Sequence, residues 1–144
     1  MPAPASRRTR SPTEINLNRK VLAYWIVTGL FCAAVGISGF AHVTHQEPIV
    51  EAMVHLGYPL YFMTIIGTAK LLGVVATLIP ARPLLKEWAY AGLCFNLAGA
   101  TASHAFSGDP LGHTIRPAIV LALCVASYLL RPESRRLASA PSLG

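Results

Sequence analysis

Residues 21–43 read VLAYWIVTGLFCAAVGISGFAHV and contain no formally charged side chain. As an α-helix they would extend about 34 Å, which is enough to cross the roughly 30 Å hydrocarbon core of a bilayer. A cleaved signal peptide has a shorter apolar region followed by a small-residue cleavage site, and neither feature is present here. This stretch therefore predicts a retained transmembrane helix.

Three further apolar stretches follow, at residues 59–80, 87–107 and 114–130, joined by short connections rich in Gly and Pro. Lys70 is the only charge inside the first of them, and Arg116 stands in the first turn of the last. Backbone polar groups must be satisfied within a bilayer, which favours helices. We therefore predict an all-α integral membrane protein, an up-down bundle of four helices.

The sequence outside these stretches divides the chain into three parts. Residues 1–18 are rich in Pro, Ser and Arg and predict a disordered basic tail, and residues 132–144 predict a flexible C-terminal tail. Residues 19–131 then form the membrane domain. Within it, apolar side chains between residues 44 and 58 have roughly helical spacing, which favours a short interfacial helix.

The composition agrees with a membrane location. Apolar residues make up 53% of the 144 residues and charged residues only 12%, too few to cover the surface of a soluble domain of this size. The net charge of +6 is carried mostly by basic residues at the ends of the apolar stretches, so we expect no nucleic-acid binding. Cys32, Cys94 and Cys124 form no CxxC pair, which predicts three small buried side chains.

Lys and Arg concentrate in alternate connections. Both terminal segments and the connection after residue 80 carry them, whereas the connections after residues 43 and 107 carry only Arg116. Because short cytoplasmic loops have an excess of Lys and Arg, this pattern predicts that both termini are cytoplasmic. The high usage of Ala, Arg and Pro indicates a bacterial source. The expected location is then the bacterial inner (plasma) membrane.

Lys70 and Asn96 stand near the middle of two neighbouring stretches, at nearly the same depth. A lysine at the centre of a membrane helix costs roughly 3 kcal/mol, so it must point into the bundle. We expect Asn96 to be its hydrogen-bond acceptor. Two interpretations stay open: a structural clamp between two helices, or a group that binds a ligand or handles a proton.

All five histidines lie toward the outer side, and so do four charged residues: Glu47, Glu51, Asp109 and Arg116. Histidine titrates near neutral pH, so a proton relay there is chemically feasible. His42 and His104 also have the minimal placement for a bis-histidine haem, but we do not expect haem, and no metal-ligand pattern is present. The candidate intramembrane pocket consists of Lys70, Asn96, His104, Glu51, His55, His42 and Arg116.

Four strings of sequence resemble the DoxX-like family of small four-helix membrane proteins. They are HLGYPLYF at 55–62, GTAKLLGVVATLIP at 67–80, LKEWAYAGLCFNLAGATASH at 85–104 and SGDP at 107–110. The resemblance covers about residues 20–130. The family's lysine motif falls on Lys70, and the family often has Asp where this chain has Asn96. That departure weakens the expectation of an intramembrane proton couple.

The resemblance implies a membrane protein without an established activity of its own. The family takes its name from a membrane subunit of a thiosulfate:quinone oxidoreductase, and other relatives are linked to oxidative stress or to the assembly of membrane receptors. We therefore expect an accessory subunit of a redox or biosynthetic membrane complex, able to bind quinone or another lipophilic molecule. A membrane-protein partner or a homo-oligomer is expected.

Two alternatives stay open at this point. One is a small membrane enzyme that uses the polar residues for acid–base or redox chemistry on a lipophilic substrate. The other is an oligomeric transporter of a small solute, suggested by a lysine at mid-membrane. The sequence leaves open whether the protein is an enzyme.

Overall fold

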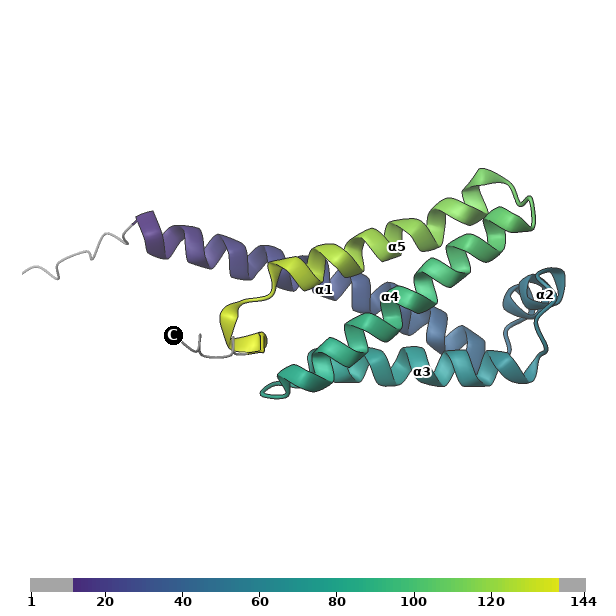
Figure 1. Ribbon diagram of the computed structural model, residues 1–144, viewed down its shortest axis with the longest axis horizontal. Helices are drawn as coiled ribbons and strands as arrows, with labels where there is room; N and C mark the ends of the chain where they lie inside the picture. Colours follow the sequence, from purple (N-terminus) through teal and green to yellow (C-terminus); the bar gives the residue numbers. More distant parts are fainter. Residues whose placement is uncertain (1–11, 138–144) are drawn as a thin grey trace, which may run out of the picture.

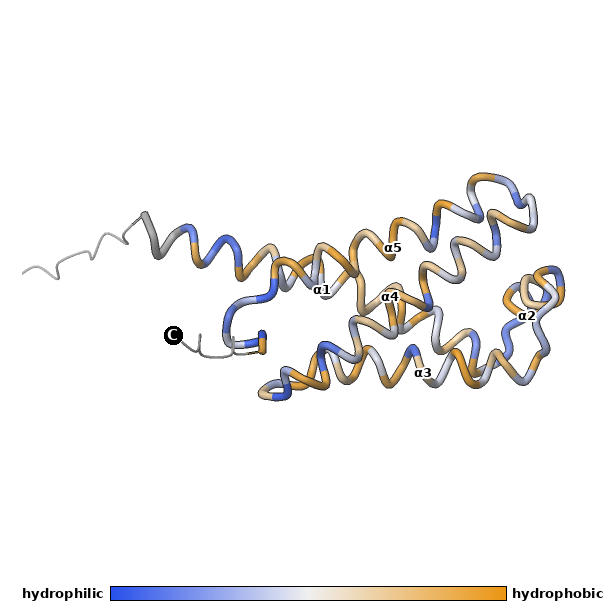
Figure 2. The backbone as a smooth tube through the Cα atoms, in the orientation of Figure 1, coloured by the Kyte–Doolittle hydropathy of each residue, from blue (hydrophilic) through white to orange (hydrophobic). Residues whose placement is uncertain are grey.

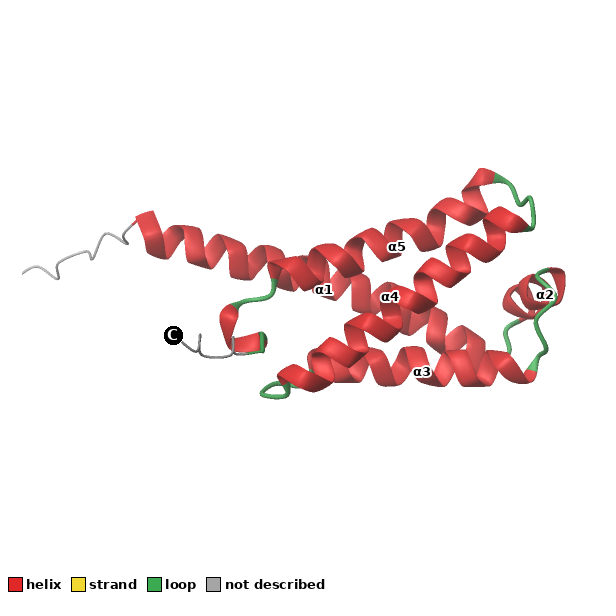
Figure 3. Cartoon of the chain, in the orientation of Figure 1, coloured by secondary structure: helices red, strands yellow, loops and turns green. Residues whose placement is uncertain are grey.

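The computed structural model describes residues 12–137, and in this range helices alternate with loops and no strand is present (Figure 3). Five α-helices and one 3-10 helix follow one another along the chain (Figure 1). Their bounds are α1 Pro12–Val43, α2 Glu47–His55, α3 Tyr61–Leu78, α4 Pro83–Phe106, α5 Leu111–Leu130 and η1 Glu133–Arg135.

Three of the described helices are long and apolar enough to cross a membrane: Asn16–Val43 in α1, Tyr61–Leu78 and Leu111–Leu130. They overlap three of the predicted stretches, 21–43, 59–80 and 114–130. The fourth, in α4, has the required length but a lower hydropathy, because Asn96 and His104 interrupt its apolar residues. Figure 2 shows apolar residues along most of each long helix and hydrophilic residues mainly toward the helix ends.

The ends of the helices differ from the predicted boundaries. α1 begins at Pro12 rather than near residue 21. A helix started in the apolar stretch can extend this far because no Gly or Pro stands between residues 13 and 28. The segment after α5 contains the short helix η1 at Glu133–Arg135. Residues 1–11 and 138–144, the outer parts of the two predicted tails, lie outside the described residues.

Each long helix packs against two others. α1 and α4 both contact α3 and α5, and α2 makes only a few contacts with α1. Figure 1 shows that successive long helices run in opposite directions, so the α3–α4 turn and η1 lie at one end and α2 with the α4–α5 turn at the other. The central core contains Phe31, Val35, Tyr90 and Leu93.

Two glycines allow α1 and α3 to approach closely. A Cβ added at Gly67 would lie 2.8 Å from the Gly39 oxygen and 2.8 Å from the Cβ of His42. Gly73 lies further along α3 and instead packs against Leu93 of α4. The small residues of α3 therefore serve two neighbouring helices.

Candidate functional site

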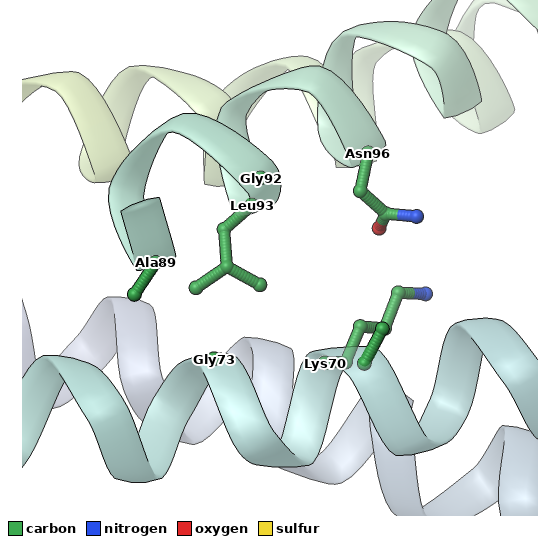
Figure 4. Close-up of a pocket in the computed structure, with 7 residues that line it drawn as sticks. Lys70, Gly73, Ala89, Gly92, Leu93 and Asn96 are labelled. Atoms are coloured by element: carbon green, nitrogen blue, oxygen red, sulfur yellow. The ribbon is translucent and has the colours of Figure 1, made fainter. Parts of the chain in front are cut away.

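A cavity of about 140 Å³ lies between α3 and α4 (Figure 4). Two polar side chains face it, Lys70 from α3 and Asn96 from α4. The remaining lining is small or apolar: Ala69, Gly73, Ala89, Gly92 and Leu93. Such a cavity suits a molecule that is mostly apolar and carries a few polar atoms.

Lys70 is directed toward α1. The Cβ of Lys70 lies against Gly39 of α1, where an added Cβ would be 3.0 Å from it. Its Nζ donates to Ser38 Oγ at 3.1 Å and lies 3.4 Å from His42 Nε2. The ion pairs of the described residues do not include Lys70, which is only 7% exposed. A buried ammonium without a carboxylate partner favours an additional acceptor nearby.

His42 is held in one tautomer by its own helix. Its Nδ1 lies 2.7 Å from the carbonyl oxygen of Ser38, which can only accept, so Nδ1 carries a hydrogen. In the neutral ring the lone pair of Nε2 is then directed at the Nζ of Lys70. Lys70, Ser38 and His42 thus form a connected polar group between α1 and α3.

The prediction that Asn96 accepts a hydrogen bond from Lys70 is wrong. The Oδ1 atom of Asn96 is buried and has no hydrogen-bond partner, whereas Lys70 donates to Ser38. Figure 4 shows the two side chains facing each other across the cavity. A buried acceptor without a partner costs about 1–3 kcal/mol. The cavity therefore contains an unsatisfied hydrogen-bond acceptor, Asn96 Oδ1, beside the ammonium group of Lys70.

A second group of polar side chains lies at the C-terminal end of α4, away from this cavity. Asp109 bridges two histidines, with its Oδ1 2.6 Å from His55 Nε2 and its Oδ2 2.6 Å from His104 Nδ1. These two hydrogen bonds lower the pKa of the Asp109 carboxyl below its ordinary value of 3.8. Nearby, the Tyr58 hydroxyl lies 2.7 Å from Ser103 Oγ. These contacts join α2 and the segment after it to α4 and the α4–α5 turn.

The residues predicted to share one pocket are thus divided. Lys70, Asn96 and His42 lie at or beside the cavity, and His55 and His104 meet at Asp109. Glu51 and Arg116 are exposed and take part in none of the described ion pairs. Within the described part of the chain, no group of side chains could hold a metal ion.

Sequence reasoning did not select Ser38, and it named Asp109 only as one of several outer polar residues. Ser38 stands one turn before His42, so its position on the same helix face was a usable signal. Asp109 follows a turn that ends at Gly108, whose φ is 70°. Its contact with His55 spans 54 residues of sequence, which no local pattern indicates.

The KEWAYAG string, Lys86 to Gly92, holds helices together. Lys86 is 1% exposed, and its Nζ donates to the carbonyl oxygens of Thr77 and Ile79 at the end of α3. Glu87 pairs with Arg131 at 2.8 Å. These contacts satisfy free carbonyls at a helix end and connect three segments of the chain.

A model of the DoxX-like family matches residues 26–127, a range that contains the cavity and the Asp109 group. A search of curated proteins and a search of solved structures gave no match.

Proposed function

This chain belongs to the DoxX-like family, and from that premise we propose that it is a four-helix membrane subunit without catalytic activity. It holds a small lipophilic molecule of the quinone type between α3 and α4 and supports a redox or biosynthetic partner in the same membrane. The observation that carries this proposal is the unmet Oδ1 of Asn96 facing the cavity beside Lys70.

The membrane arrangement has α4 as the fourth spanning helix. α4 packs between α3 and α5, both of which are apolar enough to span. Its polar side chain Asn96 faces the cavity rather than the lipid (Figure 4). The basic residues Arg82, Lys86 and Arg131 lie toward the end that holds the α3–α4 turn and η1, so this end is cytoplasmic.

The chemistry of the cavity limits its ligand. Lys70 can donate a hydrogen bond to a carbonyl or phenolate oxygen, and Asn96 Oδ1 can accept one from a hydroxyl group. A quinone ring has carbonyl oxygens, and its reduced form has hydroxyl groups in the same positions. The apolar lining from Gly73, Ala89 and Leu93 suits the ring itself.

Extraction in mild detergent followed by analysis of bound small molecules tests this proposal. The wild-type protein is expected to retain a lipophilic molecule and to show no turnover on its own. The Thr101→Val variant is a matched control on α4, because the Thr101 hydroxyl donates to the Leu97 oxygen of its own helix. Retention by wild type and Thr101→Val, together with loss in Asn96→Leu, supports the proposal, and equal retention by all three contradicts it.

A specific observation favours one second candidate, an enzyme that moves protons. Lys70 Nζ and His42 Nε2 lie 3.4 Å apart, and Ser38 fixes the tautomer in which Nε2 can take a proton. In this case Lys70 would donate a proton to a bound lipophilic substrate and would then be reprotonated by His42. Turnover by the isolated chain that is lost in His42→Phe would favour the enzyme over the accessory subunit.

A further inference from the structure

Two cysteines on neighbouring helices are in direct contact. The Sγ atom of Cys94 in α4 lies 3.1 Å from the Sγ atom of Cys124 in α5. The sulfur atoms of a disulfide are about 2.05 Å apart, so the two thiols are only about 1 Å from bonding distance. From this contact we propose that Cys94 and Cys124 are a redox pair, which forms an interhelical disulfide inside the membrane.

The surroundings of the pair decide which reagents can oxidise it. α4 and α5 pack along each other, so the packing of the two helices already holds the two thiols together. Cys124 is 0% exposed and belongs to the central core with Phe31, Leu93 and Leu97. A thiol in such a core is shielded from aqueous reagents, which limits its reactions to neighbouring groups and lipid-soluble molecules.

The third cysteine provides an internal comparison. Cys32 of α1 is also buried in this core, at 7% exposure. Among the described residues, the contact within hydrogen-bond distance joins only Cys94 to Cys124. The proposal therefore assigns oxidation to one pair and leaves Cys32 as a thiol.

The oxidation is a balanced two-electron step. The two S–H bonds break, one S–S bond forms between the sulfurs of Cys94 and Cys124, and two electrons and two protons leave. A lipid-soluble quinone accepts both electrons and both protons and becomes the quinol. Cys94 is only partly buried, so a quinone in the bilayer meets the pair at this thiol, and the proposal does not depend on a ligand in the cavity beside Lys70.

Oxidation would connect the cavity wall to α5. Leu93 and Asn96, which line the cavity, stand on either side of Cys94 in α4. A covalent link from Cys94 to Cys124 removes independent movement of this turn of α4 relative to α5. The redox state of the membrane quinone pool would then determine how freely the cavity wall moves.

Thiol counting on the full chain in liposomes tests the pair. The protein is treated separately with a short-chain quinone, diamide and copper–phenanthroline, then denatured, alkylated with iodoacetamide and weighed intact. The reduced chain is expected to take up three alkyl groups, one for each free cysteine. The oxidised chain is expected to take up one alkyl group and, before alkylation, to be lighter than the reduced chain by two hydrogen atoms.

Two variants complete the design. Cys32→Ser keeps the pair, and its alkylation should fall from two groups to none on oxidation. Cys94→Ser removes the pair, and both of its thiols should remain alkylated after every oxidant. Three alkylated thiols in the wild type after all three oxidants overturn the proposal, and so does a disulfide that links two chains instead of Cys94 and Cys124.

Discussion

Asn96 has a buried carbonyl oxygen for which the described chain provides no partner. Natural folds satisfy nearly all such groups, so an exception calls for an explanation such as a bound molecule or a catalytic role. This residue therefore separates a binding role from a structural one. A structural clamp would lose stability when Asn96 is removed, whereas a binding site would lose its ligand and gain stability.

The Asn96→Leu variant tests this difference. We expect its ligand-free form to be more stable than the wild type by about 1–3 kcal/mol, because the unmet acceptor is removed. The measurement is the thermal midpoint of unfolding in detergent, after delipidation. Thr101→Val, whose hydroxyl already donates to the Leu97 oxygen, should show no such gain. A lower midpoint for Asn96→Leu would favour the clamp.

At this scale the sequence predicted the position of the polar group but not its bonding. A lysine in the middle of an apolar stretch must face the protein interior, and Lys70 does so. Its choice of Ser38 on α1 over Asn96 on α4 depends on how α3 is rotated between them. That rotation follows from the close approach of α1 and α3 at Gly39 and Gly67. It cannot be predicted from the sequence of one helix alone.

Among the five α-helices, α2 makes the fewest contacts with the others. Its few contacts are with α1, and its last residue, His55, reaches the α4–α5 turn through Asp109. Hydrogen bonds from His55 and His104 hold the pKa of Asp109 below 3.8. A lowered carboxyl pKa stabilises the folded state above the ordinary pKa, and this contribution is lost as pH falls through the lowered value.

Hydrogen exchange of α2 measures this attachment. We expect Asp109→Asn to increase the exchange of backbone amides in α2 several-fold at neutral pH, because the anionic bridge between the two histidines is gone. The wild type should approach the variant only when the pH falls below 3.8. Glu51→Gln on the same helix is the matched control, since Glu51 is exposed. Equal exchange in Asp109→Asn and wild type would disprove the attachment.

The close contact between α1 and α3 leads to a second prediction, which concerns the packing of the helices. A Cβ at Gly67 would lie 2.8 Å from three atoms of α1, two of them in Gly39 and His42. We expect Gly67→Ala to destabilise the protein by about 1–3 kcal/mol through overpacking. Gly36→Ala, where an added Cβ meets nothing within 4 Å, should instead be neutral or stabilising by up to about 1 kcal/mol. Thermal midpoints of the two variants that do not differ would contradict this packing.

The helices themselves were largely predictable, and their boundaries were less so. Apolar length alone located α1, α3 and α5, since each must bury its backbone in lipid. α4 was predicted from length and turn residues, although Asn96 and His104 reduce its hydropathy. The extension of α1 to Pro12 was not predicted, because helix continuation into a polar segment leaves no apolar periodicity.

The whole molecule has one basic end and one histidine-rich end, and this asymmetry predicts its orientation. Single cysteines introduced as Ala81→Cys and Ser107→Cys, both at exposed turn positions, report the two ends. An impermeant maleimide added outside intact cells should label the position at Ser107 and leave the one at Ala81 unlabelled. Labelling at Ala81 alone would reverse the proposed orientation, and labelling at both would contradict four spanning helices.

We propose that the cavity between α3 and α4 holds a lipophilic molecule through Lys70 and Asn96. Native mass spectrometry of the protein extracted from its host membrane in mild detergent tests it most directly. We predict a discrete bound mass on the wild type and on Thr101→Val, and its absence from Lys70→Met and Asn96→Leu. A wild-type chain with no bound molecule, or a bound mass that both cavity variants retain, would show that the cavity is not a binding site.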